Sequence, residues 1–204
     1  LHDARARALE AAIRGARDAR ALPLTGGPEF WSNGIDLAMI EAADSPAEAS
    51  WEAIEAIDDI CLALIEARRQ WTVAALAGNA GAGGVFMALA ADEVIAREGV
   101  VLSPHYQNTG GLYGSECWIY LLPWRLGGEG AARLMPTRMP ILAREAAGMC
   151  LIDATRPGTP GDFVAQLREG VCATLAAPDF AARLPPRPRA CLPPAAPRNW
   201  RGYG

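Results

Sequence analysis

Residues 72–92, TVAALAGNAGAGGVFMALAAD, form the stretch around which the rest of the sequence is organised. It opens with an apolar run, Val73–Ala77, between turn residues, and this pattern predicts a fully buried strand. Glycines at positions 78, 81, 83 and 84 crowd around Asn79. The alanine-rich run 84–91 has no charge or helix breaker before Asp92, which predicts a short helix buried on all sides.

A strand, a glycine-rich turn and a helix in this order would leave backbone N–H groups free at the turn and at the helix start. Glycine lets a ligand approach the main chain without a side chain in the way. The partial positive charge of a helix start favours an oxygen that carries negative charge. The stretch therefore predicts a binding place for a polarised carbonyl or a phosphate, with a tight connection that binds nothing as the alternative.

Two other interpretations of this stretch are disfavoured. A P-loop is excluded, because the pattern is not GxxxxGK[ST] and the chain contains no lysine. A membrane span would also be uncharged over about twenty residues, but the glycine density and the central Asn79 favour a soluble core. We therefore expect no membrane partner.

The composition is that of one globular domain. A chain of 204 residues, 51% hydrophobic and 21% charged, can bury one core, and its net charge of −4 argues against nucleic acid as a partner. The five cysteines are widely spaced and form no CxxC pair, so we expect no metal site, no disulfide framework and a cytoplasmic protein. No signal peptide is visible, and a start at Leu1 is compatible with an N-terminal truncation.

Helix and strand patterns alternate along the chain, which predicts an α/β fold with a mostly parallel sheet. Pro23 removes a ladder donor and suits an edge strand. We expect one domain over residues 1–180, followed by a proline-rich, disordered tail over residues 181–204. The expected helices cover residues 4–18, 46–70, 84–91, 128–135, 141–148 and 162–177, and the expected strands cover residues 20–25, 73–77, 93–96 and 100–103.

The long helix begins at a signal formed by Ser45, Pro46 and Glu48. Its apolar residues recur at helical spacing and predict one buried face. That face is expected to comprise Trp51, Ile54, Ile57, Cys61 and Leu64. The pair Asp58–Asp59 is interpreted as part of a solvated face.

Polar and aromatic residues gather in the segment 104–125, just past a predicted buried strand. Such places carry the sites of many α/β proteins. A loop followed by a helix that Ser115 caps, with Trp118, Leu121 and Leu122 in the core, is the alternative. The candidate functional side chains in the segment are His105, Tyr106, Tyr113, Ser115, Glu116 and Tyr120.

The strings FWSNGID (residues 30–36) and ALAGNAGAGGVFMALAAD (residues 75–92) resemble paired backbone elements of the crotonase, or enoyl-CoA hydratase/isomerase, superfamily. The resemblance implies a crotonase-like fold and a coenzyme A thioester, whose oxygen two backbone N–H groups hold. By position these donors would belong to Ile35 and Gly83. The neighbouring residues Gly34, Asn79, Gly81 and Gly84 would bind the cofactor.

The acid and base positions depart from those of the hydratases. Where that family carries two glutamates, this chain has Phe86 and His105. A hydratase needs acid and base groups to place and activate water, and phenylalanine supplies neither. We therefore do not expect ordinary enoyl-CoA hydration.

A narrower resemblance covers residues 20–153. The strings IEAADSPAEASW, AIDD, REGVVLSPHY and LYGSECWIYLLPWR are similar to the C-terminal module of the HypX/HoxX family of hydrogenase maturation factors. This implies cleavage of formyl-CoA to CO and coenzyme A, with the CO becoming a ligand in [NiFe] hydrogenase. The implied partners are hydrogenase maturation proteins and a folate-dependent formyltransferase module that this chain does not contain.

In that family the motif implies that Tyr106 and Glu116 exchange protons and that Tyr113 and Ser115 position them. Which residue takes the proton and which gives it stays open. Departures from the family pattern are Pro23, Cys117 in place of an aromatic residue, and Trp124–Arg125 in place of a basic pair. Two other functions stay open: another crotonase-type isomerase or thioesterase, and a coenzyme A-binding module without turnover.

Overall fold

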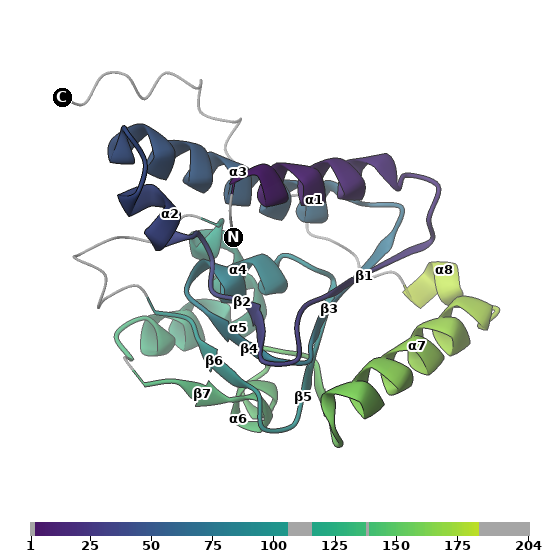
Figure 1. Cartoon of the computed structure of the whole chain (residues 1–204). Coiled ribbons are helices and arrows are strands. Elements are labelled where there is room, and N and C mark those ends of the chain that lie inside the picture. Colours follow the sequence, from purple (N-terminus) through teal and green to yellow (C-terminus); the bar gives the residue numbers. More distant parts are fainter. Residues whose placement is uncertain (1–2, 106–115, 138, 184–204) are drawn as a thin grey trace.

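The computed structural model describes residues 3–105, 116–137 and 139–183. Figure 1 shows a core of strands with helices on several sides. The strands are β1 (Ala21–Thr25), β2 (Phe30–Ser32), β3 (Trp71–Leu76), β4 (Asn79–Gly81), β5 (Glu93–Arg97), β6 (Val101–Ser103), β7 (Ile141–Leu142) and β8 (Ala154–Arg156). The helices are α1 (Asp3–Gly15), α2 (Leu37–Glu41), α3 (Pro46–Glu66), α4 (Gly83–Leu89), α5 (Trp118–Leu134), α6 (Ala143–Gly148), α7 (Pro160–Ala176) and α8 (Phe180–Arg183).

The strands form two four-stranded sheets in the part of the chain that the structure describes. The first has the order β1-β3-β5-β8 and is parallel throughout. The second has the order β2-β4-β6-β7, in which only the pair β6–β7 is antiparallel. The chain passes from the first sheet directly into the second three times, from β1 to β2, from β3 to β4 and from β5 to β6. These strands therefore follow the same order in both sheets. The predicted α/β fold with mostly parallel strands is confirmed, with two sheets where one was expected.

Glycines allow the chain segments that connect the two sheets to lie close together. A Cβ at Gly78 would lie 2.5 Å from the backbone N of Phe30, and a Cβ at Gly26 would lie 2.6 Å from the Cα of Trp31. Real Cβ atoms do not approach backbone atoms so closely, so a larger residue at either position would push two strands apart. The glycines that the sequence places after β1 and β3 thus bring β2 against β4.

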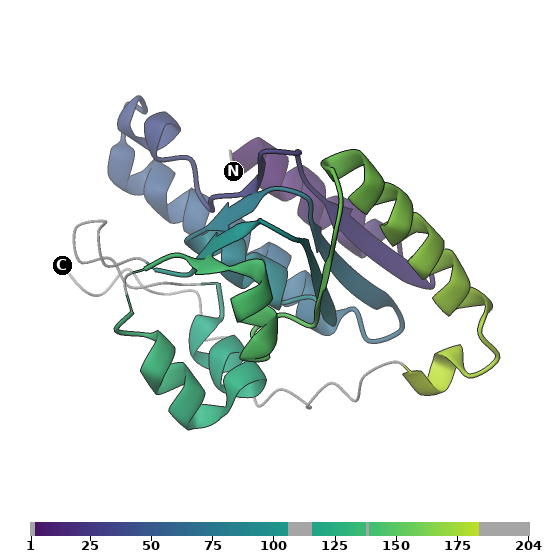
Figure 2. The same cartoon turned by 90° about the horizontal axis from the view of Figure 1, so that it is seen from below.

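Both faces of β3 are buried, which explains its uninterrupted apolar sequence. Ala74 and Leu76 join the main core with Ile57 and Leu64 of α3. Trp71, Val73 and Ala75 pack on the other face, with Phe163 and Leu167 of α7 and Phe180 of α8. Figures 1 and 2 show α1 and α3 on one side of this sheet and α7 and α8 on the other.

The connection from α4 to β5 is fixed by three hydrogen bonds between Thr72 and Asp92. Asp92 Oδ2 accepts from the backbone N and Oγ1 of Thr72, each at 2.8 Å, and Thr72 Oγ1 accepts from the backbone N of Asp92 at 2.8 Å. Thr72 is fully buried, so these bonds satisfy polar groups that water cannot reach. They place the start of β5 beside the start of β3.

Several predicted elements differ from those observed. The glycine-rich turn contains a short strand, β4, and residues 141–142, expected as helix, form β7. The expected helix 128–135 is the second half of α5, which begins at Trp118 and breaks at Gly127, where φ is 70° and ψ is 167°. Four further elements, β2, α2, β8 and α8, were not expected. Each of these strands is two or three residues long, too short to show periodicity.

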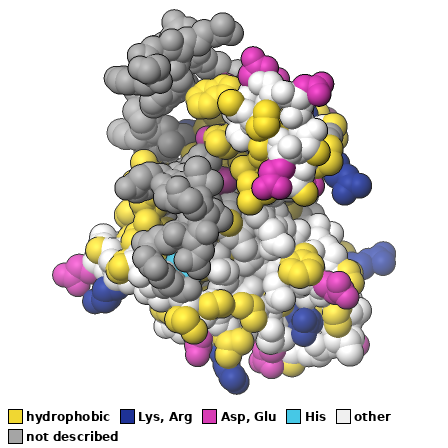
Figure 3. Space-filling view, turned by 60° about the vertical axis from the view of Figure 1, so that its left-hand side comes forward, with side chains coloured by type: hydrophobic (Ala, Val, Ile, Leu, Met, Phe, Trp, Pro, Cys, Tyr) yellow, Lys and Arg dark blue, Asp and Glu magenta, His cyan; other side chains and the backbone are white. Residues whose placement is uncertain are grey.

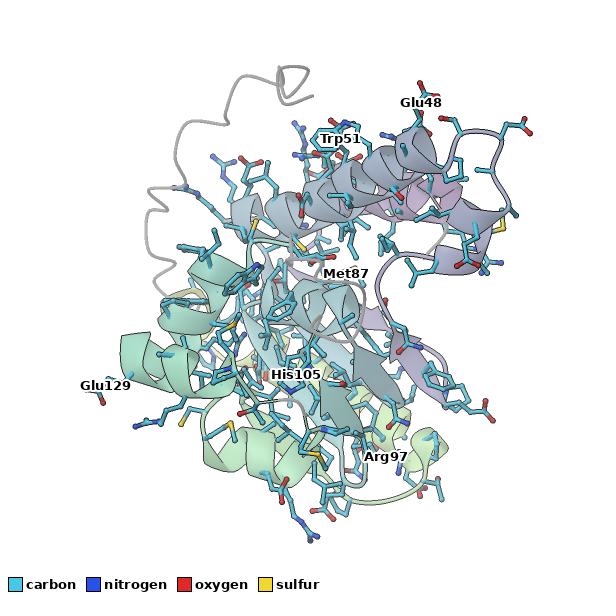
Figure 4. All side chains as sticks on the ribbon, turned by 90° about the vertical axis from the view of Figure 1, so that its left-hand side faces the viewer. Glu48, Trp51, Met87, Arg97, His105 and Glu129 are labelled. Atoms are coloured by element: carbon cyan, nitrogen blue, oxygen red, sulfur yellow. The ribbon has the colours of Figure 1, made fainter. Side chains whose placement is uncertain are left out.

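The predicted buried face of α3 is wrong at Trp51. This side chain is 45% exposed, and Figure 4 shows Trp51 and Glu48 on the outer side of α3, away from Met87 of α4. The core face instead contains small residues, Ala53 and Ala56, beside Ile57. The edge position expected for Pro23 is confirmed, because β1 is the outer strand of the first sheet.

Figure 3 shows both signs of charge scattered over one face of the molecule. Among the residues described, no helix is both long and apolar enough to cross a membrane.

Candidate active site

The two backbone elements singled out in the sequence, residues 30–36 and 75–92, lie against each other at Gly34 and Gly83. Gly34 has φ of 81°, a left-handed conformation that favours glycine. A Cβ at Gly34 would lie 3.1 Å from the backbone N of Gly83 and 3.4 Å from that of Gly84. The predicted oxygen-binding residues, Ile35 and Gly83, thus belong to turns in direct contact. That their N–H groups converge on one thioester oxygen stays a prediction.

The start of α4 is pressed onto the second sheet. A Cβ at Gly84 would overlap the carbonyl group of Ser32, at the end of β2. Ala82, the residue before α4, has φ of 44° and ψ of −127°. Its backbone N donates to Ser103 O at 2.8 Å. A positive φ in a non-glycine residue costs about 1–3 kcal/mol and is found preferentially at functional sites.

Asn79 and Gly81, predicted to bind the cofactor, lie in β4 beneath these turns. The backbone N of Asn79 donates to Glu29 O at 2.8 Å, and its Oδ1 accepts from the backbone N of Val101 at 2.9 Å. The side chain of Asn79 therefore joins β4 to the start of β6. A Cβ at Gly81 would lie 3.0 Å from Oδ1 of Asn33. Contacts of Asn79 and Gly81 with coenzyme A stay predictions.

Glu116 is the predicted catalytic residue that the structure describes, and its side chain lies against the first residue of α4, Gly83. Its side chain comes from the segment before α5, and the residue is only 3% exposed. A Cβ at Gly83 would overlap Glu116 Oε1 and lie 2.7 Å from Glu116 Cδ, and it would also lie 3.3 Å from Ile57 Cδ1. The carboxylate thus occupies the space that the missing side chain of Gly83 leaves. This brings a buried acid to the backbone predicted to hold the thioester.

The backbone at Glu116 is held in an unusual conformation. Glu116 and Cys117 have φ of 39° and 55°, two consecutive left-handed residues without glycine, each at a cost of about 1–2 kcal/mol. The backbone N of Glu116 donates to Oδ1 of Asp58, in the middle of α3. Asp58 was expected on a solvated face, so that expectation is wrong. The sequence signal that pointed to it was the string AIDD.

Two thiols complete the surroundings of Glu116. Burial raises the pKa of Cys61 well above its usual value, with further increases from Cys117, Glu116 and Asp58. Burial also raises the pKa of Cys117 to about 11, with smaller contributions from Asp58 and Glu116. Both cysteines therefore stay protonated at neutral pH, which makes them poor nucleophiles and poor metal ligands.

Three further predicted residues, Tyr106, Tyr113 and Ser115, lie outside the residues described. Within the described ranges, no three His, Cys, Asp or Glu side chains form a group that could hold a metal ion. Phe86 and His105 are the two residues expected at the acid–base positions of the hydratases. Phe86 is buried in the core at 1% exposure, and His105 Nε2 lies 3.1 Å from Met139 O. Figure 4 shows His105 below Met87 of α4.

The family model for enoyl-CoA hydratase/isomerase matches residues 3–181. The chain is 48% identical over 179 residues to the hydrogenase maturation factor HoxX of Bradyrhizobium diazoefficiens, covering 87% of this chain and 31% of that protein. HypX of Aquifex aeolicus, solved in complex with tetrahydrofolic acid, has a TM-score of 0.86 and 44% identity over 89% of this chain and 33% of its own. An enoyl-CoA hydratase of Bacillus halodurans, with a TM-score of 0.76 and 21% identity, shares the fold.

The chain thus spans about a third of the length of HoxX and HypX. The match of the family model covers most of the chain, and the mostly parallel strands with helices around them are present as two sheets. The chain belongs to the enoyl-CoA hydratase/isomerase, or crotonase, family, and within it is closely related to the C-terminal region of HoxX and HypX.

Proposed function

We propose that this chain cleaves formyl-CoA into CO and coenzyme A. The observation that carries the proposal is the buried carboxylate of Glu116 at the backbone of Gly83. This places a group that can exchange a proton beside the predicted site of the thioester carbonyl. The relation to HoxX, a hydrogenase maturation factor, supports formyl-CoA over longer acyl thioesters.

The reaction needs proton transfer but no electron acceptor. The C–H and C–S bonds of the formyl group break, an S–H bond forms, and the carbon leaves as CO. Glu116 can take the formyl proton or protonate the departing sulfur, because a carboxyl group can serve as base and then as acid. The backbone N–H groups of Ile35 and Gly83 would hold the carbonyl oxygen in place during cleavage. Tyr106 is the predicted second proton-exchanging group.

The same site is poorly suited to hydrating enoyl-CoA. Phe86, at one of the hydratase acid–base positions, is apolar and buried, and the imidazole of His105, at the other, faces the carbonyl of Met139. No second carboxylate therefore stands at these positions to activate water. Crotonyl-CoA should not be hydrated at a useful rate.

The substrate would come from a formyl-transfer reaction. Aquifex HypX was solved with tetrahydrofolic acid bound, and a folate carrier of a formyl group is a suitable donor to coenzyme A. We propose that such a folate-dependent transfer precedes the step catalysed by this chain. The CO would then serve as a ligand in [NiFe] hydrogenase maturation.

The decisive experiment follows three products at once. The purified chain is incubated with formyl-CoA, and CO is measured by its absorbance change on deoxymyoglobin, formate by formate dehydrogenase, and free coenzyme A by a thiol reagent. CO and coenzyme A in equal amounts would support the proposal. Formate in place of CO would show a thioesterase, and coenzyme A binding without either product would show a binding module. Hydration of crotonyl-CoA would show that the catalytic groups are misplaced.

The proton-exchanging role predicts the effect of Glu116→Gln. This change keeps the size of the side chain and removes its acid–base function, so CO release should fall by about a hundred- to ten-thousandfold, with little change in coenzyme A affinity. Glu129→Gln is the control, because Glu129 on α5 is 94% exposed. A Glu116→Gln protein that loses coenzyme A binding but keeps turnover per bound complex would make Glu116 structural.

A further inference from the structure

We infer that Asp58 is a positioning residue that holds Glu116 in place for proton exchange, an inference that rests on the proposed function of Glu116. Asp58 lies in the middle of α3, 58 residues before Glu116, and its Oδ1 accepts the backbone N–H of Glu116. The residue before it, Ile57, lies on the same side of Gly83 as the Glu116 carboxylate, with its Cδ1 3.3 Å from the position of a Cβ at Gly83. One turn of α3 thus contacts both parts of the candidate site.

The hydrogen bond acts where the backbone most needs support. Glu116 and Cys117 both have positive φ, and neither has the conformational freedom of glycine. The backbone N–H of Glu116 is in a buried residue, where an unpaired donor would be costly. A charged acceptor such as Asp58 makes the stronger kind of hydrogen bond. Asp58 therefore stabilises the left-handed turn from which the Glu116 side chain reaches Gly83.

Burial and charge also place Asp58 within the group of titratable residues at the site. Negative charge on Asp58 contributes to the raised pKa of both Cys61 and Cys117, as does Glu116. Asp58 and Glu116 thus lie near the same two thiols. Because Oδ1 of Asp58 accepts the backbone N–H of Glu116, a change at Asp58 should alter the position of Glu116 before it alters the rest of α3.

Two substitutions of Asp58 separate the effect of its hydrogen bond to Glu116 from the effect of its negative charge. Asp58→Asn keeps a side-chain oxygen that can accept the N–H of Glu116, and should keep kcat within about tenfold of the unmodified chain. Asp58→Ala removes the acceptor. It should lower kcat for CO release about a hundredfold, the effect of a misplaced catalytic group, with KM nearly unchanged. Glu52→Ala, which removes an exposed carboxylate from the same helix, should leave both constants unchanged.

A double substitution distinguishes positioning from general structural damage. If Asp58 acts through Glu116, Asp58→Ala added to Glu116→Gln should lower the residual activity by no more than roughly twofold, because the two changes remove one function. A second hundredfold loss would overturn the inference, as would an Asp58→Ala protein with normal kcat.

Backbone hydrogen exchange tests the inference without relying on activity. The amide of Glu116 should be protected in the unmodified chain and in Asp58→Asn, and should exchange at least about tenfold faster in Asp58→Ala. Equal exchange in Asp58→Ala and the unmodified chain would show that Asp58 does not hold the turn. If the unmodified chain releases no CO, the proposed function fails, and the exchange rates still decide whether Asp58 positions Glu116.

Discussion

At the scale of single residues, the site combines one buried acid with two thiols whose protons are retained. Glu116 is 3% exposed, and Cys61 is fully buried nearby in α3. The raised pKa of Cys117 follows first from burial and then from the negative charges of Asp58 and Glu116. Both thiols beside Glu116 thus keep their protons, and proton exchange falls to oxygen groups.

The pH dependence of Cys117 follows from its pKa. Folding raises this pKa from 9.0 to about 11, so the folded chain retains a proton that the unfolded chain loses between these values. The contribution to the free energy of unfolding is complete below pH 9 and is lost as pH rises to about 11. At pH 8, iodoacetamide should modify the exposed Cys150 and Cys172 well before Cys117, as followed by peptide mass spectrometry. Modification of Cys117 at the rate of Cys150 would contradict the assignment.

Gly83 matters because its missing side chain leaves space for the carboxylate of Glu116. A Cβ there would meet the carboxyl group of Glu116 and the tip of Ile57, so Gly83→Ala should displace Glu116 and crowd the thioester. Thioester binding and CO release should weaken together, release by about a hundredfold. Gly170→Ala is the matched control, since a Cβ there meets nothing within 4 Å and should stabilise α7 by up to about 1 kcal/mol. Normal kinetics for Gly83→Ala would remove this turn from the site.

At the scale of elements, Arg125 connects α5 to the end of α4. Its guanidinium group, on a side chain only 6% exposed, pairs with Asp153 Oδ2 at 2.9 Å and donates to Ala91 O at 2.9 Å and Leu89 O at 3.4 Å. Leu89 is the last residue of α4, where helix carbonyls lack partners within the helix, and Ala91 follows two residues later. Arg125 therefore fixes α5 relative to the helix that begins at Gly83.

Arg125→Met should lower the free energy of unfolding by about 1–3 kcal/mol, because it leaves buried carbonyl oxygens without a donor. Arg133→Met on the same helix is the control. Arg133 is 78% exposed and pairs with Glu129 only at 3.9 Å, so its loss should change stability by about 0.5 kcal/mol or less. Urea unfolding measures both values. Equal losses from the two substitutions would show that the contacts to α4 contribute nothing to stability.

Elements with strong sequence patterns were predicted well. The apolar run of β3 and the helical spacing of α3 extend over enough residues to show their structure, and the start of α3 at Pro46 was found from its helix-start signal. The strands β4, β7 and β8 pair only through two or three residues, and such pairings depend on neighbours far away in the chain. The sequence alone could therefore not predict them.

The candidate site was predictable only in part, for the same reason. Local motifs identified the turns at Gly34 and Gly83 and singled out Glu116 as a functional residue. They could not predict that the carboxylate of Glu116 fills the space beside Gly83, because 33 positions separate the two. Asp58 was missed because an acidic residue among other acidic residues of a helix resembles a solvated one.

At the scale of the whole molecule, the chain contains a crotonase domain about a third as long as HoxX and HypX. The part of the candidate site that the structure describes draws on α3, α4 and Glu116 before α5. The proposed cleavage of formyl-CoA therefore requires only groups that this chain supplies, together with the predicted Tyr106. Formation of formyl-CoA from a folate donor would require another protein or module.

The passage of one chain segment through both sheets also fixes the alignment of the strands. Only Ala77 and Gly78 separate β3 from β4, so a shift of β3 by one residue against β1 would force the same shift of β4 against β2. A shift of this kind would turn the buried side chains of both strands to the wrong faces at once. The register of the strands in each sheet thus constrains the register in the other. The start of α4, two residues after β4, takes its position from this double constraint.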